Sequence, residues 1–202
     1  MKARYAGRVD GSLDGRTVAV ARATAEHALA VELPRRWSHV RAVGQKAERI
    51  GPAFAPSDAP ALVAAAWLHD IGYAAELADT EFHPLDGARW LRSRGVDARV
   101  VTLVANHSCA PVEAAERGLA ETLGTEFPAE DSPTAEALIY CDLTTGPDGR
   151  SVTIEDRLAE IRSRYGAGSV VTRFVDRAED QLLLAVRRTQ RRLAEHASRA
   201  ST

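Results

Sequence analysis

The chain has little cysteine, few aromatic side chains and no long run of apolar residues. Its two cysteines, Cys109 and Cys141, cannot build a disulfide framework, and we expect both to be thiols in a reducing compartment. The longest apolar run, about 59–68, is too short to span a bilayer, and residues 1–10 are charged and lack the apolar core of a signal peptide. These features predict a cytoplasmic protein with no membrane partner.

Neither sign of charge dominates the composition. There are 26 Lys and Arg against 28 Asp and Glu, and the basic residues are spread along the chain. A protein that binds a nucleic acid polymer is expected to carry a basic patch, so this class is disfavoured. The 45% hydrophobic and 5% aromatic content, rich in Ala, Leu and Val, is typical of a helical protein.

The hydrophobic pattern predicts an all-α fold. Apolar residues recur at three- and four-residue intervals, and Pro or Gly marks many of the segment ends. Predicted helices cover residues 17–33, 36–50, 59–68, 83–95, 97–107, 111–124, 132–143, 154–164 and 170–196. Ser57 and Asp58 offer an N-cap for the third of these. We predict an amino-terminal arm over 1–16 and one helical domain, a single bundle, over 17–202, because a chain of this length fills one core.

One short stretch places titratable side chains where burial is expected. His69 and Asp70 directly follow the apolar run, in the sequence Trp-Leu-His-Asp-Ile-Gly-Tyr of residues 67–73. A polar pair at the end of a buried segment is costly unless a partner satisfies it, and a metal ion is the natural partner. Four more candidate ligands occur along the chain, namely His39, His83, His107 and Asp142. We interpret these six side chains as one site.

The ligand types limit the choice of metal. Imidazole and carboxylate ligands without thiolate favour Fe, Mn, Co, Ni or Zn over Mg or Ca. One ion with an open substrate position needs three or four protein ligands, so six ligands suit two ions. Plainer interpretations exist for single residues: His39 alone could be a packed histidine, and the two cysteines could be small buried side chains instead of soft ligands. His27 and His196 are expected to be packing or surface residues.

The ordered set His39, His69-Asp70, His83, His107 and Asp142 resembles the HD-domain superfamily, in particular its six-ligand members with a binuclear centre. The resemblance covers about 36–164 and implies a helical bundle of the HD-domain type. It implies that His39, His69, Asp70 and Asp142 hold one metal, and that Asp70 bridges to a second metal held by His83 and His107. His69 and Asp70 would then be the catalytic core of a phosphohydrolase. Its cofactors would be two divalent transition-metal ions, with Fe, Mn or Co ahead of Zn and Ni.

The substrate implied by this resemblance is a small phosphate ester, with a nucleotide as the expected class, cleaved by a hydroxide that the two metals share. Many relatives continue His-Asp-x-Gly with lysine, whereas this chain has Tyr73. Another cation must therefore meet the phosphate, and guanidinium groups can bind phosphate through two hydrogen bonds. The candidate substrate-binding residues are Arg36, Lys46, Tyr73, Arg150 and Arg157.

Two other functions use the same ligand set. Similar six-ligand HD proteins are di-iron oxygenases that use dioxygen on small organic or phosphonate substrates. A non-catalytic module, in which the metal is structural or senses a ligand, is the third interpretation. The ligands alone do not separate these classes.

Overall fold

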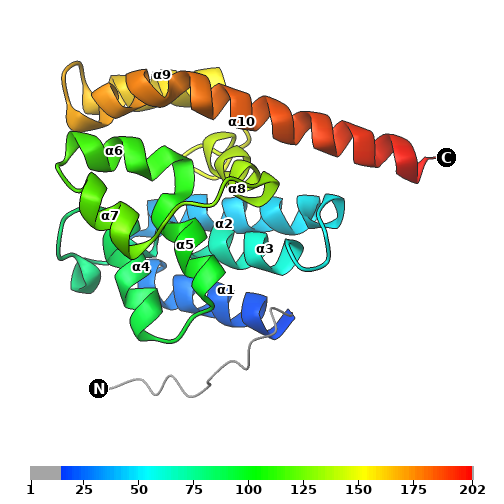
Figure 1. The fold of residues 1–202 in the computed structure, drawn as a ribbon, viewed down its shortest axis with the longest axis horizontal. Helices are drawn as coiled ribbons and strands as arrows, with labels where there is room; N and C mark the ends of the chain where they lie inside the picture. Colours follow the sequence, from blue (N-terminus) through cyan, green and yellow to red (C-terminus); the bar gives the residue numbers. More distant parts are fainter. Residues whose placement is uncertain (1–14, 202) are drawn as a thin grey trace.

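The most apolar helix, α3 (Ala59–Leu68), lies at the centre of the fold (Figure 1). In this computed structural model, which describes residues 15–201, every side chain of α3 from Ala61 to Leu68 is buried. It packs against α1 (Gly15–Leu29), α2 (Pro34–Ile50), α5 (Ala98–Asn106) and α8 (Pro133–Leu143). Burial on all sides explains why this segment is apolar on every face instead of along one stripe.

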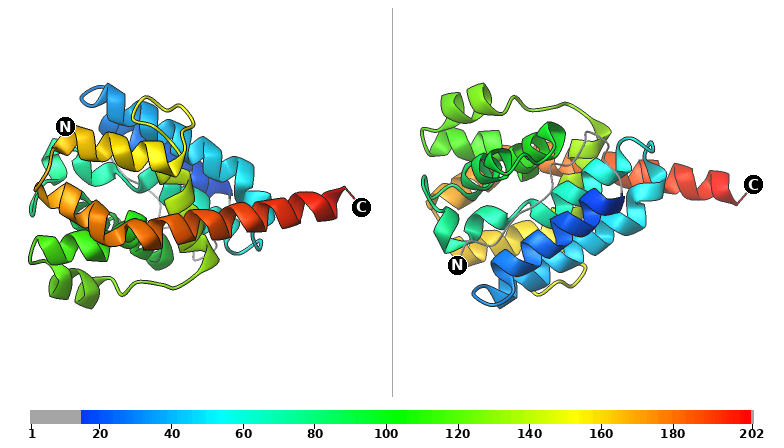
Figure 2. Two further views of the ribbon diagram at one scale, coloured as in Figure 1. Left: turned by 90° about the horizontal axis from the view of Figure 1, so that it is seen from above. Right: turned by 90° about the horizontal axis from the view of Figure 1, so that it is seen from below.

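The other helices surround this centre. They are α4 (His83–Ser93), α6 (Ala110–Glu116), α7 (Ala120–Glu126), α9 (Ile154–Tyr165) and α10 (Val170–Ala200), with 3-10 turns η1 (Gly51–Ala53), η2 (Ile71–Tyr73), η3 (Ala75–Leu77) and η4 (His107–Cys109). Figure 1 shows α9 and α10 stacked on the face opposite α1, and both views of Figure 2 show the carboxy-terminal turns of α10 extending past the other helices. The residues from 15 to 201 contain no strand beyond one isolated bridge between Thr145 and Ser151, so the predicted all-α class is confirmed.

Proline and capping side chains fix where the helices begin. A proline occupies the first turn of α2, α3, α4, α6 and α8, where its missing N–H is not needed. The side chain of Asp97 accepts the backbone N–H groups of Arg99 and Val100 at the start of α5, and Ser132 accepts that of Ala135 in α8. These caps set the directions of the helices that carry the candidate ligands.

The structure differs from the prediction in one helix that is divided, one helix end and one cap. The helix predicted over 111–124 is two helices, α6 and α7, because Gly118 takes a left-handed φ of 72° that ends α6. The first helix ends at Leu29 and not at residue 33, so a short turn precedes Pro34. Asp58 stands before α3 but makes no side-chain cap; its carboxylate accepts a hydrogen bond from Arg99 at 2.7 Å. Of the predicted arm, only Gly15 and Arg16 are described, as the first residues of α1.

Two hydrophobic clusters meet near the end of α8. The larger one surrounds α3 and includes Cys141, and the smaller one joins α9 and α10 and includes Leu143. Asp142 therefore lies between two cores, which gives its carboxylate a rigid setting. No helix in the described part of the chain combines the length and apolarity needed to cross a bilayer.

Candidate metal centre

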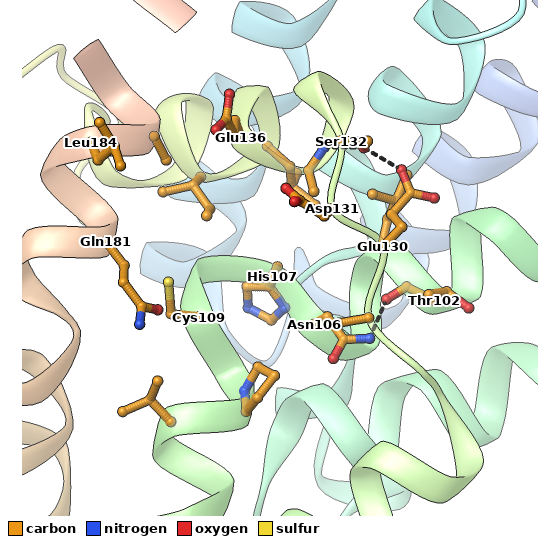
Figure 3. Close-up of a pocket in the computed structure, with 18 of the residues that line it drawn as sticks. Thr102, Asn106, His107, Cys109, Glu130, Asp131, Ser132, Glu136, Gln181 and Leu184 are labelled. Carbon is orange, nitrogen blue, oxygen red and sulfur yellow. Dashed lines mark hydrogen bonds between the residues drawn. The ribbon is translucent and has the colours of Figure 1, made fainter. Parts of the chain in front are cut away.

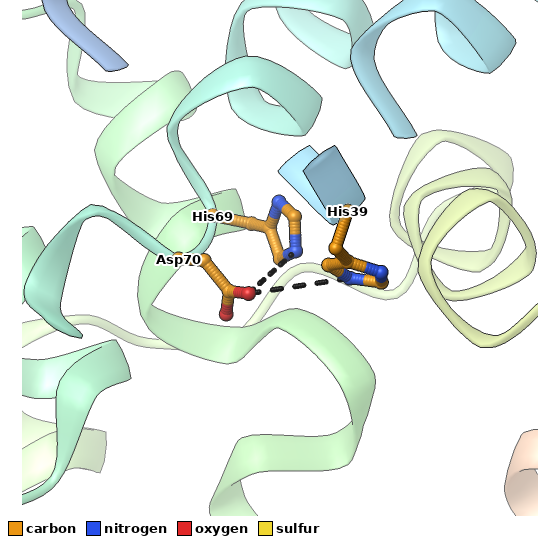
Figure 4. Close-up of side chains that lie close together, drawn as sticks. All are labelled: His39, His69 and Asp70. Atoms are coloured by element: carbon orange, nitrogen blue, oxygen red, sulfur yellow. Dashed lines mark ion pairs between the residues drawn. The ribbon is translucent and has the colours of Figure 1, made fainter. Parts of the chain in front are cut away.

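The six predicted ligands come from five places in the fold and meet in one region. His39 lies in α2, His69 and Asp70 follow α3, His83 opens α4, His107 follows α5, and Asp142 lies near the end of α8. Two groups of potential ligand atoms lie within 4.8 Å of one another: His39, His69 and Asp70, and Asp70, His83 and His107. Figure 4 shows the imidazoles of His39 and His69 turned toward the carboxylate of Asp70. Asp70 is the member common to both groups.

The two carboxylate oxygens of Asp70 face different histidine pairs. Oδ2 lies 3.4 Å from His69 Nε2 and 4.0 Å from His39 Nε2. Oδ1 lies 3.3 Å from His83 Nε2 and 3.9 Å from His107 Nε2. This division is the one required of a carboxylate that bridges two cations.

Asp142 extends the first group. Its Oδ1 lies 2.9 Å from His39 Nε2 and 3.9 Å from His69 Nε2. Its other oxygen, Oδ2, accepts a hydrogen bond from Ser108 Oγ at 2.5 Å. Ser108 therefore holds one oxygen while the other faces the histidines.

Three of the histidines are oriented by backbone carbonyls. His39 Nδ1 donates to the carbonyl of Gly146 at 3.1 Å. His69 Nδ1 donates to the carbonyl of Ala66 at 2.9 Å, and His107 Nδ1 donates to that of Val104 at 2.6 Å. Because a carbonyl oxygen only accepts, Nδ1 carries the proton and Nε2 faces the cluster. Protein ligands to metals commonly have their second ring nitrogen fixed in this way.

The donor set fits a metal ion. His69 Nε2 is fully buried and has no hydrogen-bond partner among residues 15–201, although three carboxylate or imidazole groups surround it. An unsatisfied buried nitrogen of this kind is rare in folded proteins. A cation coordinated by His39, His69, Asp70 and Asp142, with a second held by Asp70, His83 and His107, would satisfy it.

Electrostatics keep the ligands ready for a cation. Burial would raise the pKa of Asp70, but Arg36, His69 and His83 hold it well below its usual range. Burial, together with the neighbouring His83 and His69, lowers the pKa of His107 to about 4, and burial also lowers that of His83. Burial alone would lower the pKa of His69, yet Asp70 and Asp142 outweigh it and raise this pKa to about 9. Metal binding at neutral pH therefore has to displace a proton from His69.

Arg36 and Tyr73 form a stack beside the ligands. The Arg36 guanidinium lies 3.9 Å from the centroid of the Tyr73 ring, which in turn stacks on the His83 imidazole at 4.0 Å. Arg36 Nη1 also donates to Asp70 Oδ2 at 2.7 Å. A cation thus stands above the residue that replaces lysine in the motif.

A cavity of about 240 Å³ adjoins the cluster and contains side chains of both charges. Three predicted substrate-binding residues, Arg36, Tyr73 and Arg157, line it together with Asp70, His83, His107 and Asp142. A second cavity of about 350 Å³ meets it at Arg36, Tyr73 and Arg164.

Two predicted substrate-binding residues lie elsewhere. The Lys46 ammonium donates to the carbonyl and the hydroxyl of Thr144 at 2.5 and 2.8 Å and lines a different cavity. Arg150 is exposed and pairs with Asp148. Neither residue lines the ligand cavity, so this geometry gives no support to the prediction that they bind the substrate: Lys46 fixes the segment after Asp142, and Arg150 faces solvent.

Sequence reasoning missed several residues that shape this region. Asp86 is buried in α4 and accepts the backbone N–H groups of Asp79 and Thr80 and the Thr80 hydroxyl, which fixes the loop before His83. Glu81 and Ser108, which line the cavity, have left-handed φ values of 59° and 50°. Non-glycine residues in this conformation often mark functional sites. For these residues the sequence offered one signal, namely that Ser108 directly follows the candidate ligand His107.

The larger cavity of Figure 3, about 380 Å³, lies between η4, residues 129–136 and α10 and shares only His107 with the ligand cavity. Cys109 lines it, while Cys141 is fully buried. Burial raises the pKa of these thiols to about 11 and about 12, so both remain protonated at neutral pH. Neither cysteine joins the two ligand groups found among the described residues.

Comparison with known proteins identifies the family. The HD domain family model matches residues 36–161, which is more than half of the chain and contains all six candidate ligands. No curated protein and no solved structure gives a significant match. The chain therefore belongs to the HD domain family, whose members are generally metal-dependent hydrolases.

Proposed function

We propose that this HD-domain chain is a metal-dependent phosphohydrolase that cleaves a small phosphate ester, with a nucleotide as the expected substrate class. The division of the Asp70 oxygens between two histidine pairs, beside a cavity lined by arginines, is the observation that carries the proposal. Divalent ions at such a site lower the pKa of water and offset the charge of phosphoryl oxygens. No serine or cysteine nucleophile is then needed.

The protein's own side chains supply orientation and charge. Asp70 would hold both ions, while the carbonyl-bound imidazoles of His39, His69 and His107 keep Nε2 directed at them. Arg36 reaches Asp70 and lines the cavity, so a cation that binds Asp70 would free the guanidinium to bind a phosphoryl oxygen. In this arrangement Arg36, supported on Tyr73, replaces the lysine that the motif lacks.

A phosphate-release screen tests the proposal. Protein reconstituted anaerobically with Mn, Co or Fe is offered nucleoside monophosphates and other phosphomonoesters. We expect release of phosphate that Asp70→Asn abolishes and that Asp148→Asn, a change at an exposed carboxylate, leaves intact. Absence of phosphate release with every metal would contradict the proposal. Dioxygen consumption by the iron form with an organic substrate, under the same conditions, would favour the oxygenase alternative.

A further inference from the structure

The α9 wall of the ligand cavity has more arginine than carboxylate. Arg157 and Arg164 both line the cavity, and both donate to the same oxygen, Glu160 Oε2, at 2.5 and 2.7 Å. The other two arginines of the cavity, Arg36 and Arg117, each have a carboxylate of their own, Asp70 and Glu113. On the α9 wall, therefore, two guanidinium groups share a single carboxylate.

Arg157 also has an unused donor. The residue is only 6% exposed, and its Nε is buried without a hydrogen-bond partner in the described part of the chain. Leaving a buried donor unsatisfied costs about 1–3 kcal/mol, and more for a charged group. Arg157 thus binds Glu160 through Nη1 and has a second buried donor without a protein acceptor, so its guanidinium keeps hydrogen-bonding capacity for an anion in the cavity that it lines. The planar fork of arginine matches phosphate in particular.

The cavity is lined by apolar as well as charged side chains. Apolar side chains from α8, α9 and α10, namely Leu143, Ile161, Val171 and Phe174, line it as well. Arg164 stands where the cavity meets the neighbouring one of about 350 Å³, so an organic group has room to extend past it. One organic molecule could therefore place one anionic group at the α9 arginines and another group at the metal ligands.

We propose that Arg157 and Arg164 form a second anion-binding subsite, and that the substrate is a small organic molecule with two phosphate groups. One phosphate would be cleaved at the metal ligands, and the other would be held by α9 and retained. The choice of substrate class rests on the proposed hydrolase function, whereas the binding of a phosphate by α9 does not.

Calorimetric titration of the metal-free 202-residue chain tests the subsite without hydrolysis. The probes are adenosine 5′-monophosphate, adenosine 5′-diphosphate and adenosine 3′,5′-bisphosphate. We expect at least one doubly phosphorylated probe to bind about tenfold more tightly than the monophosphate, equivalent to about 1.4 kcal/mol. Arg164→Gln should reduce this preference to below about threefold, because one phosphate loses a guanidinium partner.

Two further variants make the test specific. Arg157→Lys keeps a positive charge but loses the planar guanidinium, and we expect it also to reduce the preference for doubly phosphorylated probes. If this buried change prevents folding, the Arg164→Gln variant alone tests the subsite. Arg162→Gln is the matched control, because Arg162 lies on the same helix but pairs with Asp176 and Glu179 and does not line the cavity. Equal affinity for all three probes, no effect of Arg164→Gln, or an equal effect of Arg162→Gln would overturn the subsite.

This design separates the two proposals. If the preference is present and depends on Arg164 but no phosphate ester is cleaved, the α9 subsite stands and the hydrolase proposal fails. If phosphomonoesters are cleaved and the preference is absent, the hydrolase stands and the subsite is refuted.

Discussion

Gly72 packs against the first turn of α4 with no space for a side chain. A Cβ atom there would lie 2.1 Å from the carbonyl oxygen of His83 and 2.7 Å from the backbone nitrogen of Gly87. Both are backbone atoms, so no rotamer change relieves the overlap. Gly72 does not have a left-handed φ, so alanine itself is tolerated by the conformation and even favoured by up to about 1 kcal/mol. The destabilising part of the Gly72→Ala effect is therefore steric.

The size of the overlap sets the expected cost. Ordinary contact begins near 3.4 Å, so α4 must move by about 1 Å or more to accommodate the methyl group. Overpacking costs about 1–3 kcal/mol, and a clash with rigid backbone belongs at the upper end, about 3 kcal/mol. The same movement carries His83 away from Asp70 Oδ1, now 3.3 Å distant, and from the Tyr73 ring. We expect lower stability and loss of the second metal ion together.

Urea unfolding in EDTA measures the stability of Gly72→Ala, and elemental analysis after reconstitution with manganese measures its metal content. Gly124→Ala in α7 is the control, because its Cβ would meet no atom within 4 Å, and helix propensity predicts stabilisation by up to about 1 kcal/mol. If Gly72→Ala unfolds within about 0.5 kcal/mol of the wild-type protein and binds as much manganese, the packing argument is wrong.

Three further predictions concern the same region. Asp86→Ala should lower the free energy of unfolding by about 2–4 kcal/mol, since it leaves the N–H groups of Asp79 and Thr80 without their acceptor. Urea unfolding measures this, with Asp148→Ala as the control at an exposed site. Arg36→Gln should raise KM for a phosphate ester by about tenfold or more. Arg41→Gln, on an exposed side of α2, should leave KM unchanged. Equal KM values for the Arg36→Gln variant and the wild-type protein would exclude Arg36 from phosphate binding. Metal-free protein should be most stable near pH 6.5. Above it, the folded chain keeps a proton on His69, whose pKa is raised to about 9, while the unfolded chain releases it, so stability falls toward pH 9. Below it, the unfolded chain protonates His107 first, because its folded pKa is lowered to about 4, so stability falls toward pH 4. Urea midpoints in EDTA that rise steadily from pH 5 to 9 would contradict this account.

Local patterns were sufficient to predict most of the fold. The helices could be located from apolar spacing and from four prolines near helix starts, Pro34, Pro60, Pro84 and Pro133. These signals act within a single segment of the chain. The break at Gly118 was missed, since a glycine inside a helical pattern can either continue the helix or end it. Asp58 matched a capping pattern, but a distant partner, Arg99, took its carboxylate.

Part of the candidate site could likewise be predicted from the sequence, and part could not. The order of histidines and aspartates could be read from the sequence, and the structure brings all six together. The carbonyls that orient His39, His69 and His107 could not be read, because every residue has a carbonyl and only tertiary structure selects Gly146 for His39. Lys46 and Arg150 were chosen for their charge alone, and charge does not determine which surface a side chain faces. Arg164 was missed for the same reason.

The number of ions bound per chain tests the central claim most directly. Protein purified anaerobically and reconstituted with manganese is analysed for metal beside the double variant His83→Gln/His107→Gln. Asp70 shared between two histidine pairs predicts two ions in the wild-type protein and one in the double variant, held by His39, His69, Asp70 and Asp142. A wild-type protein that binds no more than one ion, or a double variant that still binds two, would contradict the binuclear centre.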